Sequence, residues 1–189
     1  MTKKVIKIGN AGGYWGDDPT ALKRQVEGGH LDYITMDFLA EITMSIMQKQ
    51  KGRDPESGYA RDFIPMLDGV IEKAMASGTK IITNAGGINP MGCAKAITEM
   101  ALKHGLRPKI AVVQGDDIMN DIDRLVASGA EFTNMESGEK FENVIDRLQS
   151  ANIYFGATPV VAALKENPDI IITGRVTDTG ITVAPMIHE

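Results

Sequence analysis

Residues 80–87 have the sequence KIITNAGG, and an earlier stretch, residues 4–13, has the sequence KVIKIGNAGG. Both stretches join a short, largely apolar run to the same Asn-Ala-Gly-Gly turn, and a proline follows each turn within a few residues. A buried strand that ends in a glycine-rich turn before a helix is the repeating unit of a parallel α/β sheet. The repeat therefore predicts two strand-to-helix units whose turns face the same edge of one sheet.

The same alternation of apolar runs and helical periodicity extends along the rest of the chain. Strands are predicted at 5–9, 31–36, 80–83, 109–114, 152–156 and 169–174, and helices at 19–29, 39–50, 63–77, 90–105, 118–129, 159–167 and from Thr179. The segment 131–144 predicts either a polar insertion or a short hairpin. Because the strands are apolar on both faces, helices are expected on both sides of the sheet. The prediction is a three-layer, Rossmann-like (doubly wound) α/β domain with a mostly parallel sheet of about six strands. A fragment of a (β/α) barrel is the alternative.

Three of the helix starts place a polar residue directly before a proline: Asp18-Pro19, Asn89-Pro90 and Thr158-Pro159. A side-chain oxygen at the N-cap accepts a backbone N–H that would otherwise lack a partner, and proline has no N–H to satisfy. The three pairs therefore predict where these helices begin.

Composition limits the class of protein. The chain has 189 residues, a net charge of −5 and a single cysteine, Cys93, so we expect one domain over 1–189 with no internal disulfide. The acidic balance argues against a nucleic-acid partner. No apolar run is long enough for a membrane span, and the first residues resemble no signal peptide, so a cytoplasmic location is expected.

The two turns predict a ligand site. In a parallel α/β sheet, strand-to-helix turns line the carboxyl edge, where ligands usually bind. Glycine amides and helix N-termini there suit a carboxylate, a phosphate or an oxyanion. The expected substrate-binding residues are Asn10, Gly12, Gly13, Trp15, Asn84, Gly86, Gly87, Asn89 and Arg175. The plainer interpretation is that tight turns favour glycine in any case. Neither the dinucleotide fingerprint nor the P-loop motif is present, so NAD and ATP are not expected.

Acidic residues gather at the same predicted edge: Asp17, Asp18, Asp37, Glu41, Asp116, Asp117 and Asp178. Neighbouring carboxylates raise one another's pKa, which makes a general acid or base available near neutral pH. Asp37, Asp117 and Asp178 are the candidate catalytic residues, and Arg175 is the candidate clamp for a substrate carboxylate. Several of the seven have simpler roles as helix caps or solvated side chains. Oxygen ligands of this kind also suit a divalent cation, whose ligands the sequence leaves unknown.

Other candidates carry weaker signals. Tyr14 and Trp15 lie between glycines and are expected either to line a ligand pocket or to cover the core. Cys93 and the three histidines are expected to be structural. Arg53 and Arg61 lie in a long polar connection, which predicts a solvated linker or, alternatively, a contact with the phosphates of coenzyme A.

A set of motifs across the whole chain resembles the acyclic terpene utilisation (AtuA) family: IGNAGGYWGDDP (8–19), VEGGHLDYITMDFLAEITMSIM (26–47), DPESGYARDF (54–63), TNAGGINP (83–90), VVQGDD (112–117), SANIYFGATPVVAAL (150–164) and ITGRVTDTGITVAP (172–185). Family members are typically longer, so the resemblance implies an amino-terminal domain. It also implies a role in the breakdown of citronellol- and geraniol-type terpenes through acyl-CoA intermediates.

Two functions follow as hypotheses. The first is an enzyme of the lyase, hydratase or isomerase type, acting on a small carboxylic acid or acyl-CoA. The second is a non-catalytic ligand-binding domain or subunit that needs a carboxyl-terminal domain or a partner protein. A homo-oligomer, and a divalent cation as cofactor, are left open.

Overall fold

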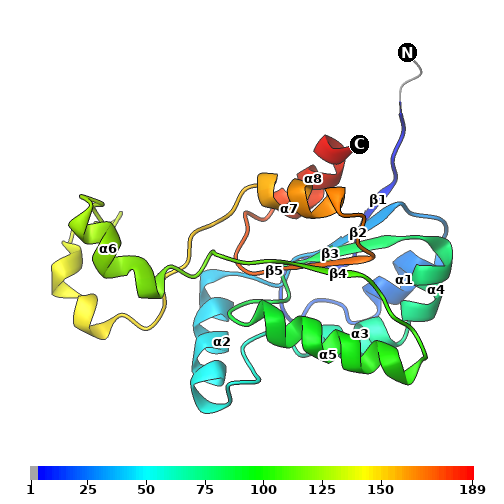
Figure 1. The fold of residues 1–189 in the computed structure, drawn as a ribbon, viewed down its shortest axis with the longest axis horizontal. Helices are drawn as coiled ribbons and strands as arrows, with labels where there is room; N and C mark the ends of the chain where they lie inside the picture. Colours follow the sequence, from blue (N-terminus) through cyan, green and yellow to red (C-terminus); the bar gives the residue numbers. More distant parts are fainter. Residues whose placement is uncertain (1–3) are drawn as a thin grey trace.

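The computed structural model describes residues 4–189 and has five parallel strands in one sheet (Figure 1). The strands are β1 (Ile8–Asn10), β2 (Tyr33–Met36), β3 (Lys80–Thr83), β4 (Ile110–Val113) and β5 (Ile170–Thr173), in the spatial order β1-β2-β3-β5-β4. Every pairing is parallel, with Ile34 opposite Ile81 and Ile82 opposite Ile171 in the central strands. The predicted three-layer, Rossmann-like α/β fold is confirmed.

Helices cover both faces of the sheet. The helices are α1 (Ala21–Glu27), α2 (Glu41–Arg53), α3 (Phe63–Asp68), α4 (Ile71–Ser77), α5 (Pro90–Lys103), α6 (Ile122–Ala127), α7 (Thr158–Lys165) and α8 (Gly180–His188), with short 3-10 turns at Met119–Asp121, Phe141–Asn143 and Ile145–Arg147. Helices α1 to α5 lie on one face, and α7 and α8 lie on the other (Figure 1).

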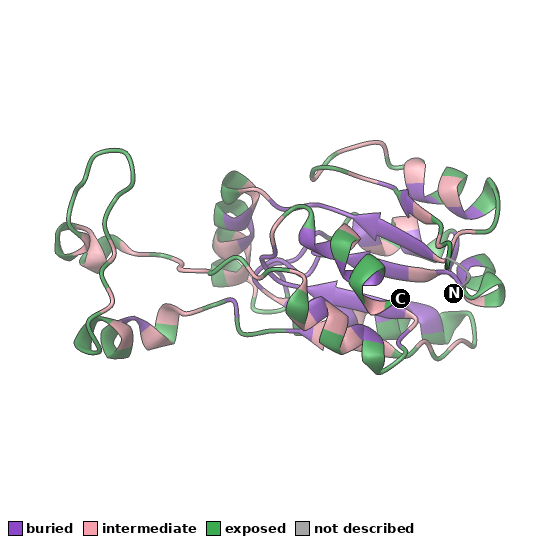
Figure 2. Cartoon of the chain, turned by 90° about the horizontal axis from the view of Figure 1, so that it is seen from above, coloured by how far each residue is buried: buried purple, intermediate pink, exposed green. Residues whose placement is uncertain are grey.

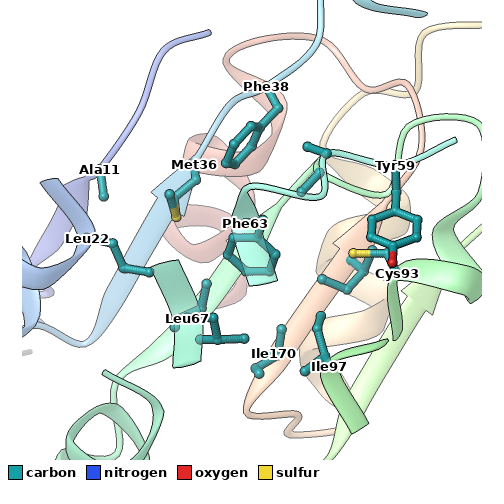
Figure 3. Packing of buried hydrophobic residues seen from close by; sticks show 14 of the residues in the cluster. Ala11, Leu22, Met36, Phe38, Tyr59, Phe63, Leu67, Cys93, Ile97 and Ile170 are labelled. Atoms are coloured by element: carbon teal, nitrogen blue, oxygen red, sulfur yellow. The ribbon is translucent and has the colours of Figure 1, made fainter. Parts of the chain in front are cut away.

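The core divides into two clusters because side chains alternate along each strand. Ile170 and Ile172 of β5 pack into the larger cluster beneath α1 to α5, whereas Ile171 between them packs into the smaller cluster beneath α7 and α8. Figure 3 shows part of the larger cluster, where the rings of Phe38 and Phe63 meet edge to face with centroids 5.9 Å apart. The apolar side chains of β5 thus pack against helices on both faces of the sheet.

One predicted strand is wrong. Residues 152–156 form only isolated bridges, from Asn152 to Asp117 and from Phe155 to Val176. Ile153 and Tyr154 are 43% and 48% exposed, because the segment crosses the rim of the sheet instead of lying between two neighbouring strands. A short apolar run has the same sequence pattern whether it forms a strand within the sheet or crosses the rim of the sheet.

The predicted helix over 63–77 is two helices. Helix α3 ends at Asp68 and α4 begins at Ile71, and Val70 between them has φ −140°, outside the helical region. Gly69 lies at this break, and glycine weakens a continuous helix. Gly78 ends α4 with φ 71°, the left-handed cap that the sequence predicted.

The three predicted helix caps have different outcomes. Asn89 is confirmed, since its side chain accepts the N–H of Gly92 at 3.0 Å and Pro90 is the first helical residue. Asp18 accepts the N–H of Thr20, which itself precedes α1, so the cap lies two residues earlier than a true N-cap. Thr158 is already inside α7 and makes no capping bond.

Residues 115–152 leave the carboxyl edge of the sheet and form an arm that extends well beyond the body of the molecule (Figures 1 and 2). The arm includes α6 and a small apolar contact between Phe132 and Phe141, whose rings are 5.2 Å apart. Most of its residues are exposed or half-buried. The predicted hairpin at 131–144 is reduced to one antiparallel bridge, between Thr133 and Lys140.

The two Asn-Ala-Gly-Gly turns differ in packing. A Cβ at Gly86 would lie 2.5 Å from the carbonyl oxygen of Thr173 and 2.9 Å from the Cα of Pro90. A Cβ at the equivalent Gly12 would meet nothing closer than 4.0 Å. The second turn therefore needs glycine at position 86, because Thr173 at the end of β5 and Pro90 at the start of α5 lie so close to its backbone. The first turn has no such requirement at Gly12.

We predict that Gly86→Ala destabilises the protein by about 1–3 kcal/mol, because the backbone atoms around it cannot move aside cheaply. The matched variant Gly12→Ala should change the free energy of unfolding by less than about 0.5 kcal/mol. Urea denaturation of both variants measures the difference, and equal losses would contradict the assignment of the close approach to the second turn.

Candidate functional site

The strand order creates one natural crevice at the carboxyl edge. The chain leaves β3 towards α5 on one face of the sheet, whereas it leaves the neighbouring β5 towards α8 on the other face. Loops that diverge in this way open a gap between them, which is the usual ligand site of open α/β sheets. Asn84 follows β3 and Arg175 follows β5, so these two residues flank the gap.

Both Asn-Ala-Gly-Gly turns lie at this edge, as predicted. The first follows β1 and the second follows β3, and β2 lies between them in the sheet. The loop after β2 therefore connects the two turns in space. It contains Asp37, whose backbone N–H donates to the carbonyl of Gly12 at 2.9 Å.

Asn84 ties the loop after β2 to the loop after β3. Its side chain is fully buried; Oδ1 accepts the N–H of Phe38 at 2.7 Å, and Nδ2 donates to Oδ1 of Asp37 at 2.6 Å. All the bonds of this amide that the structure describes are internal to the protein. Asn84 thus fixes the position of the Asp37 carboxyl group and of the backbone at Phe38.

Asp37 is a buried acid beside the gap. It is 8% exposed, and its Oδ1 also accepts the N–H of Leu39 at 3.0 Å. Burial raises the pKa of Asp37, and the hydrogen bonds from Asn84 and Leu39 offset only part of this rise. The charge of Asp178 raises the pKa further, and that of Arg175 lowers it. A carboxyl group in this setting suits proton transfer.

Arg175 lies beside it and is 4% exposed. Its Nη1 donates to the carbonyl of Leu39 at 2.9 Å, and its guanidinium stacks on the ring of Tyr154, 4.0 Å from the centroid. Nε is buried and has no hydrogen-bond partner in the described residues. A buried guanidinium with a free N–H retains the capacity to bind one more acceptor.

Two carboxylates approach the same guanidinium from the solvent side. Oε1 of Glu41 lies 3.6 Å from Nη2, and Oδ1 of Asp178 lies 3.5 Å from Nη1. Their side chains are 77% and 73% exposed. The hydroxyl of Tyr154 also donates to Glu41, and this hydrogen bond lowers the pKa of Glu41. Glu41 and Tyr154 together cover Arg175.

Asp116 connects the site to the base of the arm. It is 4% exposed, and its Oδ2 accepts the backbone N–H of Arg175 at 2.8 Å and Nδ2 of Asn152 at 3.0 Å. Burial raises its pKa, as at Asp37. Asp116 therefore orders the backbone on which Arg175 is placed.

Asp117 has a different environment from Asp37 and Asp178. Its Oδ1 accepts the N–H of Met119 at the start of the arm. It borders a hollow of about 140 Å³ whose lining also includes Lys51, Gly87, Asp116 and Asn152. The structure thus brings Asp37 and Asp178 together around Arg175 and places Asp117 elsewhere on the same edge.

The glycine-turn amides are largely bonded within the protein. The N–H of Gly12 donates to Oδ1 of Asn10, and that of Gly13 donates to Oδ2 of Asp17. In the second turn, the N–H of Gly87 donates to the carbonyl of Asn84. An anion at these amides would have to replace the existing acceptors.

The polar connection after α2 is an ordered part of the edge. Arg61 binds Asp54 and Ser57 within the connection, and residues 57–60 are buried. Asn89, besides capping α5, donates to the carbonyl of Ser57 at 2.9 Å. The segment therefore packs against the second turn, and this packing departs from the predicted solvated linker.

The comparison with family models agrees with the motifs. The model described as "Acyclic terpene utilisation family protein AtuA" matches residues 6–189. The chain belongs to the acyclic terpene utilisation (AtuA) family. Searches of the curated proteins and of the solved structures gave no match. The family's description associates this AtuA-family chain with acyclic terpene utilisation.

Two further observations concern metal binding and membrane-spanning helices. Among residues 4–189, no group of three or more His, Cys, Asp or Glu side chains is arranged to hold a metal ion. None of the helices described in this AtuA-family chain has both the length and the apolar character needed to cross a membrane.

Sequence reasoning missed Tyr154 and Asn152. Both lie in the segment 152–156, which the sequence predicted as a strand of the sheet. Instead Tyr154 stacks on Arg175 and Asn152 binds Asp116. The available signal was the polar Asn and Tyr inside a short run that follows a long acidic segment.

We predict that Asp37→Asn becomes more stable relative to the wild type as pH rises. The wild-type protein is not penalised below the ordinary pKa of 3.8, because Asp37 is then protonated in both the folded and the unfolded state. As pH rises through the raised folded-state pKa, a charge forms in the buried site and the wild type loses stability. Asparagine carries no such charge. The stability gap should grow by up to about 1.4 kcal/mol per unit of pKa shift.

Urea denaturation at about pH 4 and about pH 7 measures this gap. Asp123→Asn, on the exposed side of α6, is the matched control and should show no growing gap. A gap at Asp37 that stays constant with pH would show that its ionisation is not coupled to folding.

Proposed function

We propose that this protein is an enzyme that moves a proton on a carboxylic acid or acyl-CoA substrate, in a reaction of the lyase, hydratase or isomerase type. The observation that carries the proposal is the buried pair formed by Asp37, whose pKa is raised, and Arg175, whose Nε has no hydrogen-bond partner within residues 4–189. Perturbed, buried acids beside a free donor in a sheet-edge crevice are typical of catalytic sites.

The proposed roles follow from the chemistry of the two side chains. Arg175 donates to the carboxylate or thioester carbonyl of the substrate, and Asp37 accepts a proton from the carbon next to that carbonyl. The negative charge that develops on the carbonyl oxygen is then stabilised by the guanidinium. Asp37 returns the proton to another position of the substrate, and Asp178 is the second acid–base candidate.

A substrate can reach the guanidinium of Arg175 only if Glu41 and Tyr154, which cover it, move away. Glu41 and Tyr154 occupy the solvent side of the guanidinium, and Tyr154 lies just after the arm. A substrate carboxylate carries the same charge as Glu41 and would take its place. The arm and the site are therefore expected to move together when substrate binds.

A non-catalytic ligand-binding role is the second candidate. One observation favours it: the cavity of about 490 Å³ beside the first glycine turn is bordered by none of Asp37, Arg175 and Asp178. A domain that only binds a ligand would use this cavity and leave the acids as structural groups.

Deuterium exchange tests the proposed function without knowledge of the product. The protein is incubated in D₂O with branched acyl-CoA thioesters and with the corresponding free acids, and mass spectrometry detects deuterium incorporated next to the carbonyl. Wild-type protein should catalyse exchange, and Asp37→Asn should reduce the rate by about 100-fold or more. Arg175→Lys should also slow exchange, because lysine cannot reproduce the planar fork.

Exchange that persists in Asp37→Asn would overturn the role of Asp37. Binding of the thioester without exchange in the wild type would favour the ligand-binding role. Asp123→Asn, which removes one exposed carboxylate from the arm, is the control for a general charge effect.

A second prediction concerns the cover over Arg175. Glu41→Gln should bind isovalerate about threefold or more tightly than the wild type, because one competing carboxylate is removed. Calorimetric titration measures the change. Glu136→Gln makes the same change of charge on the exposed arm and should leave the affinity unaltered; an equal gain there would indicate only a nonspecific charge effect.

A further inference from the structure

The arm formed by residues 115–152 buries little of its own surface. Asp116 at its base and Ile122 of α6 are buried, the other residues of the arm are exposed or half-buried, and Met135 is fully exposed. An ordered segment normally offsets its loss of conformational entropy by burying apolar side chains. The arm therefore retains apolar surface that a partner can cover.

The arm carries a hollow of about 270 Å³, which we call the arm hollow, and its lining includes Phe132 and Phe141. Both rings are half-buried, so part of their apolar surface is open to solvent. Glu131, Glu142 and Lys140 border the same hollow, and all three are exposed. The arm hollow thus combines aromatic surface with a border on which carboxylates outnumber the cation.

The arm also carries the acidic charge of the molecule. Residues 115–152 include nine acidic and three basic residues, which gives a net charge of −6. The whole chain has a net charge of −5, so the remaining residues sum to +1. A surface that covers the arm is therefore expected to be apolar and cationic.

One face of α2 has this complementary character. Ile42 and Ile46 are 69% and 41% exposed, and the exposed residues Lys49 and Arg53 continue the same face at intervals of three or four residues. Within residues 4–189, neither Lys49 nor Arg53 takes part in an ion pair. Helix α2 lies at the end of the body from which the arm leaves (Figure 1).

We infer that the arm is a dimerisation element, and that the arm hollow receives the exposed face of α2 from a second copy of this chain. Ile42 and Ile46 of one copy pack against the aromatic surface of the hollow in the other copy, and Lys49 and Arg53 approach its glutamates. A two-fold axis repeats the contact, since each copy offers one arm and one α2. The inference does not depend on the proposed function, because it uses no residue of that site.

A second copy is favoured over other partners because both halves of the contact belong to this chain. The arm extends away from the body in both views, and the described lining of the arm hollow includes no residue of α2 (Figures 1 and 2). Exchange between two copies joins the acidic hollow to the cationic face, and two such contacts bury twice the surface of one.

The first test is the mass of the protein in solution. Analytical ultracentrifugation of the full chain, whose mass is 20.4 kDa, should detect a dimer at tens of micromolar. Because the contact pairs opposite charges near the surface, a rise in salt from about 50 mM to about 500 mM should weaken the dimer. A chain that stays monomeric at low salt would overturn the inference.

Charge-reversal variants identify the two surfaces. The α2 variant carries Lys49→Glu and Arg53→Glu, and the arm variant carries Glu131→Lys and Glu142→Lys. Each variant alone should have a dimer dissociation constant at least about tenfold higher than the wild type, because like charges then face one another. An unchanged dissociation constant in either variant would overturn the assignment of these surfaces.

An equimolar mixture of the two variants distinguishes a lost contact from a misfolded protein. In the mixed dimer, two wild-type surfaces meet at one contact and two reversed surfaces meet at the other, so the mixture should regain a dimer close to wild-type affinity. Lys73→Glu combined with Lys103→Glu reverses two exposed cations elsewhere and should leave the dimer unchanged. An equal loss in this control, or no recovery in the mixture, would overturn the inference.

Cross-linking of the wild type shows which chains are in contact. Unlabelled and ¹⁵N-labelled protein are mixed, and a carbodiimide joins carboxylates to amines that touch. Peptides that link Glu131 or Glu142 to Lys49 should combine one labelled and one unlabelled partner. Links confined to a single isotope would place the arm against α2 of its own chain and would overturn the exchange.

Discussion

The buried amide of Asn84 is the contact on which the edge of this sheet depends. A parallel sheet brings the ends of its strands to one edge, but it does not fix how the loops beyond them lie. Asn84 does so for two of them, since it accepts from the backbone of Phe38 and donates to the carboxyl group of Asp37. Arg175 extends the connection by donating to the carbonyl of Leu39, and Asp116 holds the backbone of Arg175. Four loops are thereby linked. Burial among them raises the pKa of Asp37, and the hydrogen bonds from Asn84 and Leu39 offset part of that rise.

The same four-residue turn has two different roles. After β3, Gly86 allows β5 and α5 to approach the backbone more closely than any side chain would permit, and residues 84–87 are fully buried. After β1, the turn has open space beside Gly12 and borders the cavity of about 490 Å³. The difference arises from position in the sheet, because β3 is a central strand with neighbours on both sides and β1 is an edge strand. A repeated motif therefore indicates repeated local geometry, and it does not indicate a repeated function.

The edge has two compartments with opposite chemistry. Arg175 supplies a buried cation between exposed carboxylates, and the cavity beside β1 has an apolar wall and an acidic rim. Just after β2, the carboxyl group of Asp37 contacts Asn84, whereas its neighbours Met36 and Phe38 line the cavity. Tyr154, just after the arm, stacks on Arg175 of the first compartment.

The sequence by itself determined the fold class, the family, and the positions of all five strands and most helices to within a few residues. These depend on local periodicity and on turn chemistry that neighbouring residues supply. It also placed Asp37, Arg175 and Asp178 at one edge. Only the tertiary structure decided that Tyr154 and Asn152 belong to the site, that the helix from Phe63 breaks at Gly69 and Val70, and that Asp117 lies apart. These features depend on which distant backbone each segment meets. The pattern of a short apolar run is the same whether it pairs in a sheet or crosses its rim, and only contact with Arg175 and Asp116 distinguishes the two.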